Sequence, residues 1–224
     1  HGHNERALAT IRLLKKKFKG VEIVGGNVAT PKGTIDLIKA GADAVKVGIG
    51  PGAACTTRIV TGVGVPQLTA ILECAEAAAK YKVPIIADGG IRNSGDLSKA
   101  LAAGASAVMI GSLLAGTDES PGEYIFEEGV GYKLYRVLAS RDAADEKTKL
   151  DGSQEDGVYR APEGKSGKVP YRGRAKNVLD DLTAGLRSSM SYLGARDLKE
   201  FQKNAKIKKI TSAALRESYS HDMK

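Results

Sequence analysis

Apolar runs alternate with segments of helical periodicity over the first half of the chain. The apolar runs are short and bounded by glycine or proline, which is typical of buried strands followed by loops. The helical segments carry apolar residues on one face; Pro31 opens one of them, and Ser94 is expected to cap another. Strands are expected at residues 21–28, 44–47, 84–87 and 107–110, and helices at residues 7–18, 31–40, 69–81 and 94–103.

The strand, glycine loop and helix form a unit that is repeated four times. Residues 40–48, AGADAVKVG, return as AGASAVMIG at residues 103–111. Apolar strands joined by helices predict a parallel sheet whose outer face is covered. We expect an α/β fold of the (β/α)8 TIM-barrel class, because glycine and acidic residues gather where the strands end. A doubly wound sheet is the alternative, but no GxGxxG motif opens the first unit.

The second half of the chain departs from this pattern. Residues 117–176 are polar, glycine-rich and charged, which is typical of a flap over an active site. Helical periodicity resumes at residues 178–193, and a basic tail is expected at residues 195–224. The expected organisation is therefore barrel units 5 to 8 in residues 1–116, a loop and flap in residues 117–176, and the last helix and tail in residues 177–224. Four units make half of an eight-stranded barrel, so we expect a piece of a longer protein that does not fold alone.

Composition limits the classes of function. The 224 residues are 42% hydrophobic, enough for a sizeable core, and the net charge is +8. Much of the excess charge lies in runs such as residues 15–17 and 199–209, interpreted as solvated surface, with a patch for anionic ligands as the alternative. Nucleic acid is not expected, because basic residues do not interleave with aromatic ones. The absence of an apolar run of membrane length and the use of two cysteines favour a reduced, cytoplasmic protein. His1 and His3 are interpreted as loop residues, with a metal site as the alternative.

One cysteine lies in a glycine-rich loop directly after an apolar strand. This loop, residues 48–58, has the sequence GIGPGAACTTR and carries Cys55. Its glycines let backbone amides approach a ligand, and the loop presents the thiol for nucleophilic chemistry. Cys74 instead lies on the apolar face of an expected helix, where a packing role is favoured. Cys55 is therefore the candidate nucleophile, with a small buried side chain as the alternative.

Several short motifs are distributed over nearly the whole chain. They are GGNV at residues 25–28, GPGAACTTR at 50–58, GVGVPQ at 62–67, ADGG at 87–90, MIGS at 109–112, and ESPGE at 119–123. Together they resemble the inosine monophosphate dehydrogenase and guanosine monophosphate reductase family. The opening HGH resembles the loop after the fourth barrel strand of that family, in agreement with a chain that begins inside a barrel.

The resemblance implies a purine nucleotide oxidoreductase. In this family the cysteine, here Cys55, adds to C2 of the purine of a nucleoside monophosphate, and a hydride passes between that carbon and NAD or NADP. Thr57 and Glu163 would act together on the proton of water or ammonia, with a solvated charge as the alternative for Glu163. For Asp88 the alternative role is a helix cap. For the glycines that follow the strands, the alternative is a plain turn. The implied nucleotide contacts are Asp88 at the ribose, Gly89, Gly90, Gly111 and Ser112 around the phosphate, and Tyr135 and Glu163.

The same resemblance implies a cofactor face and a cation site beside the cysteine. Gly48, Ile49 and Gly50 would line the cofactor side. Carbonyls of the cysteine loop would bind a monovalent cation, potassium, and a tail from a neighbouring subunit of a homotetramer would complete the site. Histidine is usual in the family where this chain has Tyr219, and an ordinary surface tail is the alternative. The residues implied for the cation are Gly50, Gly52, Cys55, Glu217, Ser218 and Tyr219.

Four positions depart from the family pattern near the phosphate. Ala53 stands where serine is usual, and residues 135–140 are YRVLAS where the family has YRGMGS. Val137 and Ala139 add Cβ atoms where backbone amides approach the phosphate, which predicts weaker or altered nucleotide binding.

Two activities and one binding role fit the motifs. The Arg-Tyr pair usual in dehydrogenase flaps is absent between residues 141 and 157, and residues 159–165 resemble the reductases. Residues 58–60, 86–91 and 216–218 resemble bacterial or archaeal dehydrogenases. We expect the dehydrogenase activity, with the reductase as the alternative and a non-catalytic nucleotide-binding relative as a third possibility.

Overall fold

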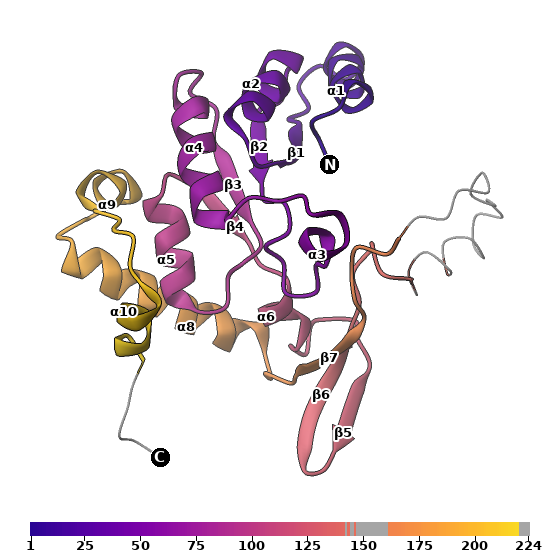
Figure 1. The fold of residues 1–224 in the computed structure, drawn as a ribbon, viewed down its shortest axis with the longest axis vertical. Helices are drawn as coiled ribbons and strands as arrows, with labels where there is room; N and C mark the ends of the chain where they lie inside the picture. Colours follow the sequence, from indigo (N-terminus) through magenta and orange to yellow (C-terminus); the bar gives the residue numbers. More distant parts are fainter. Residues whose placement is uncertain (142, 144–145, 147–160, 220–224) are drawn as a thin grey trace.

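The computed structural model describes all residues except 142, 144–145, 147–160 and 220–224 (Figure 1). Its strands are β1 (Val24–Val28), β2 (Ala44–Val47), β3 (Ile85–Asp88), β4 (Ala107–Met109), β5 (Tyr124–Glu127), β6 (Val130–Tyr135) and β7 (Gly167–Pro170). Its helices are α1 (Glu5–Lys17), α2 (Pro31–Ala40), α3 (Thr57–Thr61), α4 (Gln67–Ala79), α5 (Ser94–Ala102), α6 (Ser112–Ala115), α8 (Ala175–Tyr192), α9 (Leu198–Asn204) and α10 (Ser212–Glu217).

Strands β1 to β4 form a parallel sheet in the order β1-β2-β3-β4. Strands β2, β3 and β4 are followed by glycine-containing loops, whereas β1 carries its glycines within the strand. Helices α2, α4 and α5 follow β1, β2 and β3, and the short α6 follows β4. Val45 and Val47 of β2 are fully buried, whereas Lys46 between them points to the opposite face, because side chains alternate along a strand. The expected α/β fold with a parallel sheet is confirmed.

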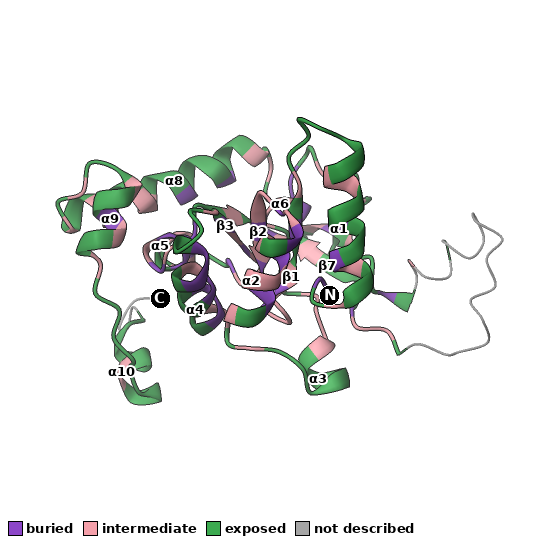
Figure 2. Cartoon of the chain, turned by 90° about the horizontal axis from the view of Figure 1, so that it is seen from above, coloured by how far each residue is buried: buried purple, intermediate pink, exposed green. Residues whose placement is uncertain are grey.

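One face of this sheet is covered by helices, and the other, the polar face, carries Lys46 and Asp88 together with apolar side chains. Helices α2, α4 and α5 pack on the covered face, where Leu37 and Ile71 are almost completely buried (Figure 2). Within the described residues β1 and β4 are the edges of the sheet, so it is open and does not close into a barrel. Val24 and Met109 lie on these edge strands and are about half exposed, at 52% and 45%.

Several expected boundaries were displaced by local hydrogen bonds. The first strand begins at Val24 and not at residue 21, since the backbone N–H of Ile23 donates to the Asp43 carboxylate at 2.7 Å instead of to a strand. The expectation that Ser94 caps α5 was wrong. Asn93 is the cap, and its Oδ1 accepts from the N–H of Asp96 at 2.9 Å. Asparagine is as good a cap as serine, so the sequence preference did not discriminate between these neighbours.

The expected flap contains a second sheet. Strands β5, β6 and β7 pair antiparallel, and Tyr124 packs edge-on against Tyr171 with ring centroids 5.1 Å apart. The expected basic tail also carries structure, because α9 buries Phe201 to 2% exposure. The Arg-Tyr pair of dehydrogenase flaps would be expected between residues 141 and 157, of which only 141, 143 and 146 are among the described residues. Residues 159 and 160 also lie outside them.

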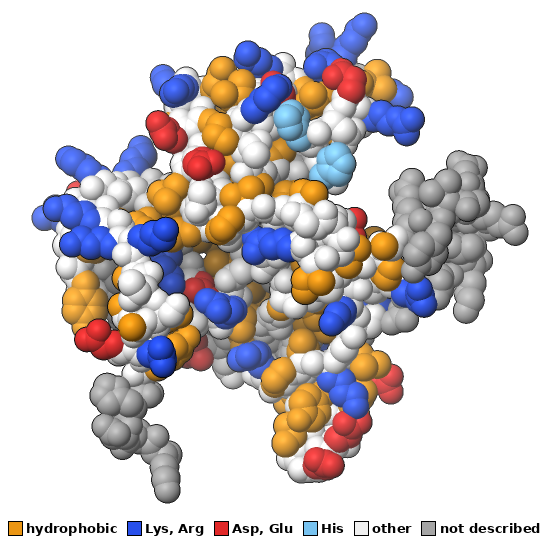
Figure 3. Space-filling view, viewed as in Figure 1, with side chains coloured by type: hydrophobic (Ala, Val, Ile, Leu, Met, Phe, Trp, Pro, Cys, Tyr) orange, Lys and Arg blue, Asp and Glu red, His pale blue; other side chains and the backbone are white. Residues whose placement is uncertain are grey.

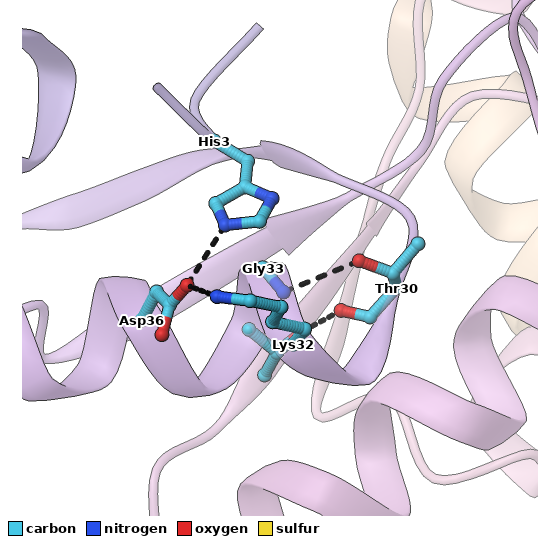
Figure 4. A network of polar contacts seen from close by, with 6 residues as sticks. His3, Thr30, Lys32, Gly33 and Asp36 are labelled. Carbon is cyan, nitrogen blue, oxygen red and sulfur yellow. Dashed lines mark hydrogen bonds and ion pairs between the residues drawn. The ribbon is translucent and has the colours of Figure 1, made fainter. Parts of the chain in front are cut away.

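The N-terminal segment is fastened to the first unit. His3 Nε2 lies 2.8 Å from Asp36 Oδ2, and Lys32 Nζ donates to the same oxygen at 2.6 Å (Figure 4). Hydrogen bonds from Lys32 and then from His3 lower the pKa of Asp36. Thr30 caps α2 through Oγ1, which accepts from the N–H of Gly33 at 3.2 Å. His3 is therefore engaged in a hydrogen bond with Asp36 of α2, as fits its interpretation as a loop residue.

Charged side chains are spread over the surface. In the view of Figure 3, Lys and Arg side chains are interleaved with acidic and apolar ones over the helices. This distribution agrees with the interpretation of the basic runs as solvated surface. No helix in the described part of the chain has the length and apolar character needed to cross a membrane.

Candidate active site

Cys55 lies in the loop that follows β2, at the end of the sheet where the parallel strands terminate. The N–H of Gly48 donates to Val28 O at 2.9 Å, which seats the start of the loop on β1. The N–H of Cys55 donates to Gly52 O at 3.1 Å and closes a turn. The thiol is half-buried. A thiol held in a tight turn and still partly accessible is suited to nucleophilic attack on a bound ligand.

The cysteine is linked to a carboxylate through one hydroxyl. The thiol of Cys55 lies 3.2 Å from Oγ1 of Thr57, within hydrogen-bond distance for sulfur. The Thr57 hydroxyl donates to Oε2 of Glu163 at 2.7 Å. The structure therefore brings together three residues expected to be catalytic, although Thr57 and Glu163 are 106 positions apart in the sequence. Such an arrangement can move a proton from a hydroxyl or a water beside the thiol to the carboxylate.

Backbone pairing brings Glu163 to the cysteine loop. The N–H of Thr56 donates to Glu163 O at 2.8 Å, and the N–H of Lys165 donates to Ala54 O at 2.9 Å. On the other side, the N–H of Glu163 donates to Ala139 O at 3.1 Å. The segment that carries Glu163 thus lies between the cysteine loop and residues 137–140, and both neighbours fix its position.

Asp88 ends β3 on the polar face of the sheet and is held by two side chains. Its Oδ2 forms an ion pair with Nζ of Lys46 and accepts from Nδ2 of Asn27 at 2.9 Å. Asn27 Nδ2 also donates to Gly48 O at 2.9 Å, so it joins the carboxylate to the cysteine loop. Among the described residues, these side-chain contacts reach Oδ2 and not Oδ1, which leaves the second oxygen able to accept from a ligand hydroxyl.

Lys46 and Asn27 were not predicted to belong to the site. The sequence pattern assigns Lys46 to an apolar strand, although a lysine between two buried valines needs a polar partner. Strand alternation would have placed it on the same face as Asp88, because Lys46 pairs with Ile86, two residues earlier on β3. The alternation of Lys46 with two valines was visible in the sequence, whereas the register of β2 with β3 was not.

Two further side chains hold the loop residues that were expected to face a cofactor. Gln67 Nε2 donates to Val47 O and to Asp88 O, at 3.1 Å each, and bridges β2 and β3. A Cβ on Gly48 would lie 2.2 Å from that same Asp88 oxygen. Arg58 donates to the carbonyl of Ile49, and its stem occupies the space beside Gly50, where a Cβ would lie 2.5 Å from Arg58 Cγ. Glycine is needed at both positions for contacts within the protein itself.

The residues expected at the phosphate surround the ends of β3 and β4. Gly89 has a φ of +87°, and a Cβ there would lie 3.1 Å from Pro51 Cγ, so this turn packs on the cysteine loop. Gly90 follows with a φ of +81°, and Ser112 begins α6. The hydroxyl of Tyr135 lies 3.1 Å from the Cβ position of Gly111. Burial, and secondarily the charge of Asp88, raises the pKa of Tyr135, so its hydroxyl stays protonated and able to donate.

A cavity of about 960 Å³ opens beside this cluster. Gly111, Leu114 and Tyr135 line it, together with Leu179 of α8. Cys55 and Asp88 do not line it. The cavity therefore adjoins the expected phosphate end, and the thiol of Cys55 and the carboxylate expected at the ribose lie outside its lining.

The remaining expected residues lie elsewhere. Glu217, Ser218 and Tyr219 are at the end of α10, which lies away from α3 and the cysteine loop in both views of the ribbon (Figures 1 and 2). Cys74 is completely buried in α4, and burial raises the pKa of its thiol while a hydrogen bond with Thr34 opposes this. Cys74 therefore remains a neutral core residue, as expected from the sequence.

The domain model for IMP dehydrogenase / GMP reductase matches residues 1–221. The chain belongs to this family. It is 56% identical over 224 residues to the inosine-5'-monophosphate dehydrogenase of Aquifex aeolicus, covering all of this chain and 46% of that protein. The corresponding enzyme of Chlorobaculum parvum is 53% identical over 229 residues, with the same two coverages. The family resemblance carried by the sequence motifs is confirmed.

Solved structures of the family share this fold. A crystal structure of a GMP reductase from Trypanosoma brucei, in complex with guanosine 5'-monophosphate, superposes with a TM-score of 0.93 at 41% identity. The match covers all of this chain and 46% of that one. The chain spans about half the length of the curated relatives it matches.

Proposed function

We propose that this chain carries the nucleophile-bearing part of an IMP dehydrogenase site, which converts IMP, NAD and water to XMP, NADH and a proton. The observation that carries the proposal is the hydrogen-bonded series from Cys55 through Thr57 to Glu163, with distances of 3.2 and 2.7 Å. Relatives that are named as this enzyme, at 53% and 56% identity over the whole chain, support the choice of reaction.

In the first stage the Cys55 thiolate adds to C2 of the purine of IMP. NAD, held beside Gly48, Ile49 and Gly50, would supply the acceptor for the hydride of C2, as nicotinamide cofactors do. The carbon is then joined to sulfur in a covalent thioimidate. Asp88 would hold the ribose through Oδ1, and the Tyr135 hydroxyl would donate to the phosphate, so that C2 is presented to the thiol.

In the second stage water displaces the cysteine. A water molecule adds to C2, its proton passes to Thr57 while Thr57 passes its own proton to Glu163, and the carbon–sulfur bond breaks to release XMP and the Cys55 thiolate. The carboxylate accepts in the geometry observed, because Thr57 already donates to Oε2. Gly48, Ile49 and Gly50 precede Cys55 in the same loop, and we assign them to the cofactor side.

We further propose that the open edges of the sheet pair with other strands to complete a (β/α)8 barrel. Support comes from the half-exposed Val24 and Met109 on the edge strands and from the polar face with Lys46 and Asp88, which would point into the barrel. In that arrangement residues 1–116 supply the last units, residues 117–176 the loop and flap, and residues 177–224 the final helix and tail.

A potassium ion would bind carbonyls of Gly50, Gly52 and Cys55. The carbonyl of Gly52 already accepts from the N–H of Cys55 and keeps a second lone pair for a cation. Because α10 lies away from this loop in the same chain, Glu217, Ser218 and Tyr219 would have to come from a second copy, as in a homotetramer. Loss of activity when potassium is replaced by lithium would support this assignment.

GMP reductase is the second candidate, in which GMP and NADPH give IMP and ammonia. It is favoured by the 41% identity and the TM-score of 0.93 to the Trypanosoma brucei reductase. The same thiol, hydroxyl and carboxylate would serve it, with ammonia in place of water.

The test is an assay of the full-length protein with each pair of substrates. NADH formation from IMP and NAD supports the dehydrogenase, whereas NADPH oxidation with GMP overturns it in favour of the reductase. Nucleotide binding without turnover in either direction would leave a binding protein. Cys55→Ala is expected to abolish turnover and retain IMP binding, and the matched variant Cys74→Ala is expected to keep turnover.

A further inference from the structure

Gly164, which follows Glu163, is enclosed on two sides by backbone. It forms one bridge with Cys55 and another with Ser140, and it is buried. The catalytic carboxylate proposed above is thus attached to a residue that is fixed between the cysteine loop and residues 137–140.

The side chain of Val137 occupies the space that glycine leaves open at position 164. A Cβ on Gly164 would lie 2.2 Å from Cγ2 of Val137, closer than any two such atoms approach, so the valine methyl fills that volume. Leu138, next in the chain, is 95% exposed. Of these two apolar neighbours, Val137 is the one that packs against the segment carrying Glu163.

The loop around Val137 is itself closed and connected to Glu163. The N–H of Ser140 donates to Val137 O at 2.9 Å, and Ala139 O accepts from the N–H of Glu163 at 3.1 Å. Ser140 is 2% exposed. Val137 therefore projects from a defined turn, and its methyl meets Gly164 where the backbone bonds already align the two segments.

We propose that Val137 is a positioning residue for the hydrolytic stage: its contact with Gly164 holds Glu163 at hydrogen-bond distance from Thr57. This inference rests on the proposed function, because it assumes that Glu163 accepts the proton of water. It also reinterprets a departure from the family pattern. The Val137 side chain packs against Gly164, so it does not have to project into the expected phosphate site.

The two stages of the reaction separate this role from a general packing role. Hydride transfer needs Cys55, the nucleotide and NAD, whereas release of XMP also needs the proton transfer through Thr57 and Glu163. A small displacement of Glu163 should slow the second stage and leave the first unchanged. An apolar side chain that only stabilised the fold would affect neither stage, or both together.

The experiment follows NADH by rapid mixing of the full-length protein with IMP and NAD. In Val137→Ala the first turnover is expected at the wild-type rate, whereas later turnovers should be roughly tenfold slower. This loss of rate is smaller than the ~100-fold that a 1 Å misplacement of a catalytic group can cost. Gly164→Ala should behave alike, because its new Cβ collides with Val137. The double variant should recover much of the loss, since the smaller side chain makes room for that Cβ.

Two variants serve as controls. Val137→Ile keeps both γ carbons, one of them at the position of Cγ2, and is expected to retain wild-type turnover. Leu138→Ala removes an exposed side chain from the same loop and should change neither stage. Equal turnover in Val137→Ala and wild type would overturn the inference, as would an equal loss in both stages or a double variant slower than both single ones. If wild type forms no NADH at all, the proposed function fails first and is recognised by that result.

Discussion

Lys46 and Asp88 form an ion pair on the polar face of the sheet, across two adjacent parallel strands. The exposed fractions of the two side chains are 25% and 21%, so the pair is shielded on most sides but open to a ligand. The ammonium neutralises the carboxylate through Oδ2 and leaves Oδ1 for another donor. Lys46 thereby sets both the charge and the orientation of the group proposed to bind the ribose.

Replacing Lys46 with methionine should weaken binding of IMP roughly tenfold or more, the size expected when a hydrogen bond to a charged group is lost. The effect should nearly vanish for 2'-deoxy-IMP if Asp88 is oriented toward the 2'-hydroxyl. The dissociation constants of both nucleotides, measured by calorimetry for wild type and variant, give this comparison.

A matched variant is Lys32→Met, which removes a lysine that also pairs with an aspartate, Asp36, but on the outer helix α2. It should leave both dissociation constants unchanged. Equal losses for the ribose and deoxyribose nucleotides in Lys46→Met would contradict a role through the sugar hydroxyl.

The two cysteines should differ sharply toward an alkylating reagent. Cys55 is half-buried in a loop, whereas Cys74 is completely buried and burial raises the pKa of its thiol. Because the thiolate is the reactive form, iodoacetamide at neutral pH should modify Cys55 in the native protein and spare Cys74. Bound IMP should protect Cys55.

Mass spectrometry can read this result directly. Trypsin cleaves after Lys46, Arg58 and Lys80, so the two cysteines fall in separate peptides. In denaturant both peptides should be modified. Labelling of Cys74 in the native state, at a rate like that of Cys55, would show that α4 opens and that the burial argument is wrong.

Gly48→Ala should destabilise the cysteine loop more than an alanine at another glycine of positive φ. Gly48 has a φ of +150° and Gly62 a φ of +71°, so both substitutions strain the backbone. At Gly62 a Cβ meets nothing within 4 Å, whereas at Gly48 it would lie 2.2 Å from Asp88 O. We expect the free energy of unfolding to fall by about 1 kcal/mol in Gly62→Ala and by about 2 to 5 kcal/mol in Gly48→Ala.

Urea unfolding of the full-length variants measures both values. The Gly48 variant should also bind IMP more weakly, since the collision displaces the last residue of β3. Similar losses of stability in the two variants would mean that the loop relaxes away from Asp88 without cost.

The parallel sheet could be predicted because its strands are short apolar runs that alternate with helical segments, and three of the four are followed by a loop that contains glycine. The contact between Thr57 and Glu163 could not be derived from periodicity, since no local pattern relates two residues 106 positions apart. It was expected through the family resemblance alone. The structure adds what the motifs lacked, namely the backbone pairing of Gly164 with both Cys55 and Ser140.

The antiparallel sheet was missed for a physical reason. Strands β5 and β7 are mostly exposed on both faces, with β5 burying none of its residues fully, so they lack the apolar alternation that marks a strand. Helix α9 was likewise hidden in a basic stretch in which Phe201 is its one fully buried residue. Lys46 was the opposite case, since its unusual position in an apolar strand could have been recognised.

The cap of α5 supplies a last prediction, because two adjacent residues both have side chains that could serve. Asn93 Oδ1 accepts from the N–H of Asp96, whereas Ser94 is already the first helical residue and its Cβ packs against Gly185 of α8. Asn93→Ala should lower the free energy of unfolding by about 1 kcal/mol, the usual value of a lost cap. Ser94→Ala keeps the Cβ and should cost clearly less. The urea midpoints of unfolding of the two variants decide between the caps. A larger loss of stability in Ser94→Ala than in Asn93→Ala would restore Ser94 as the cap, as the sequence suggested.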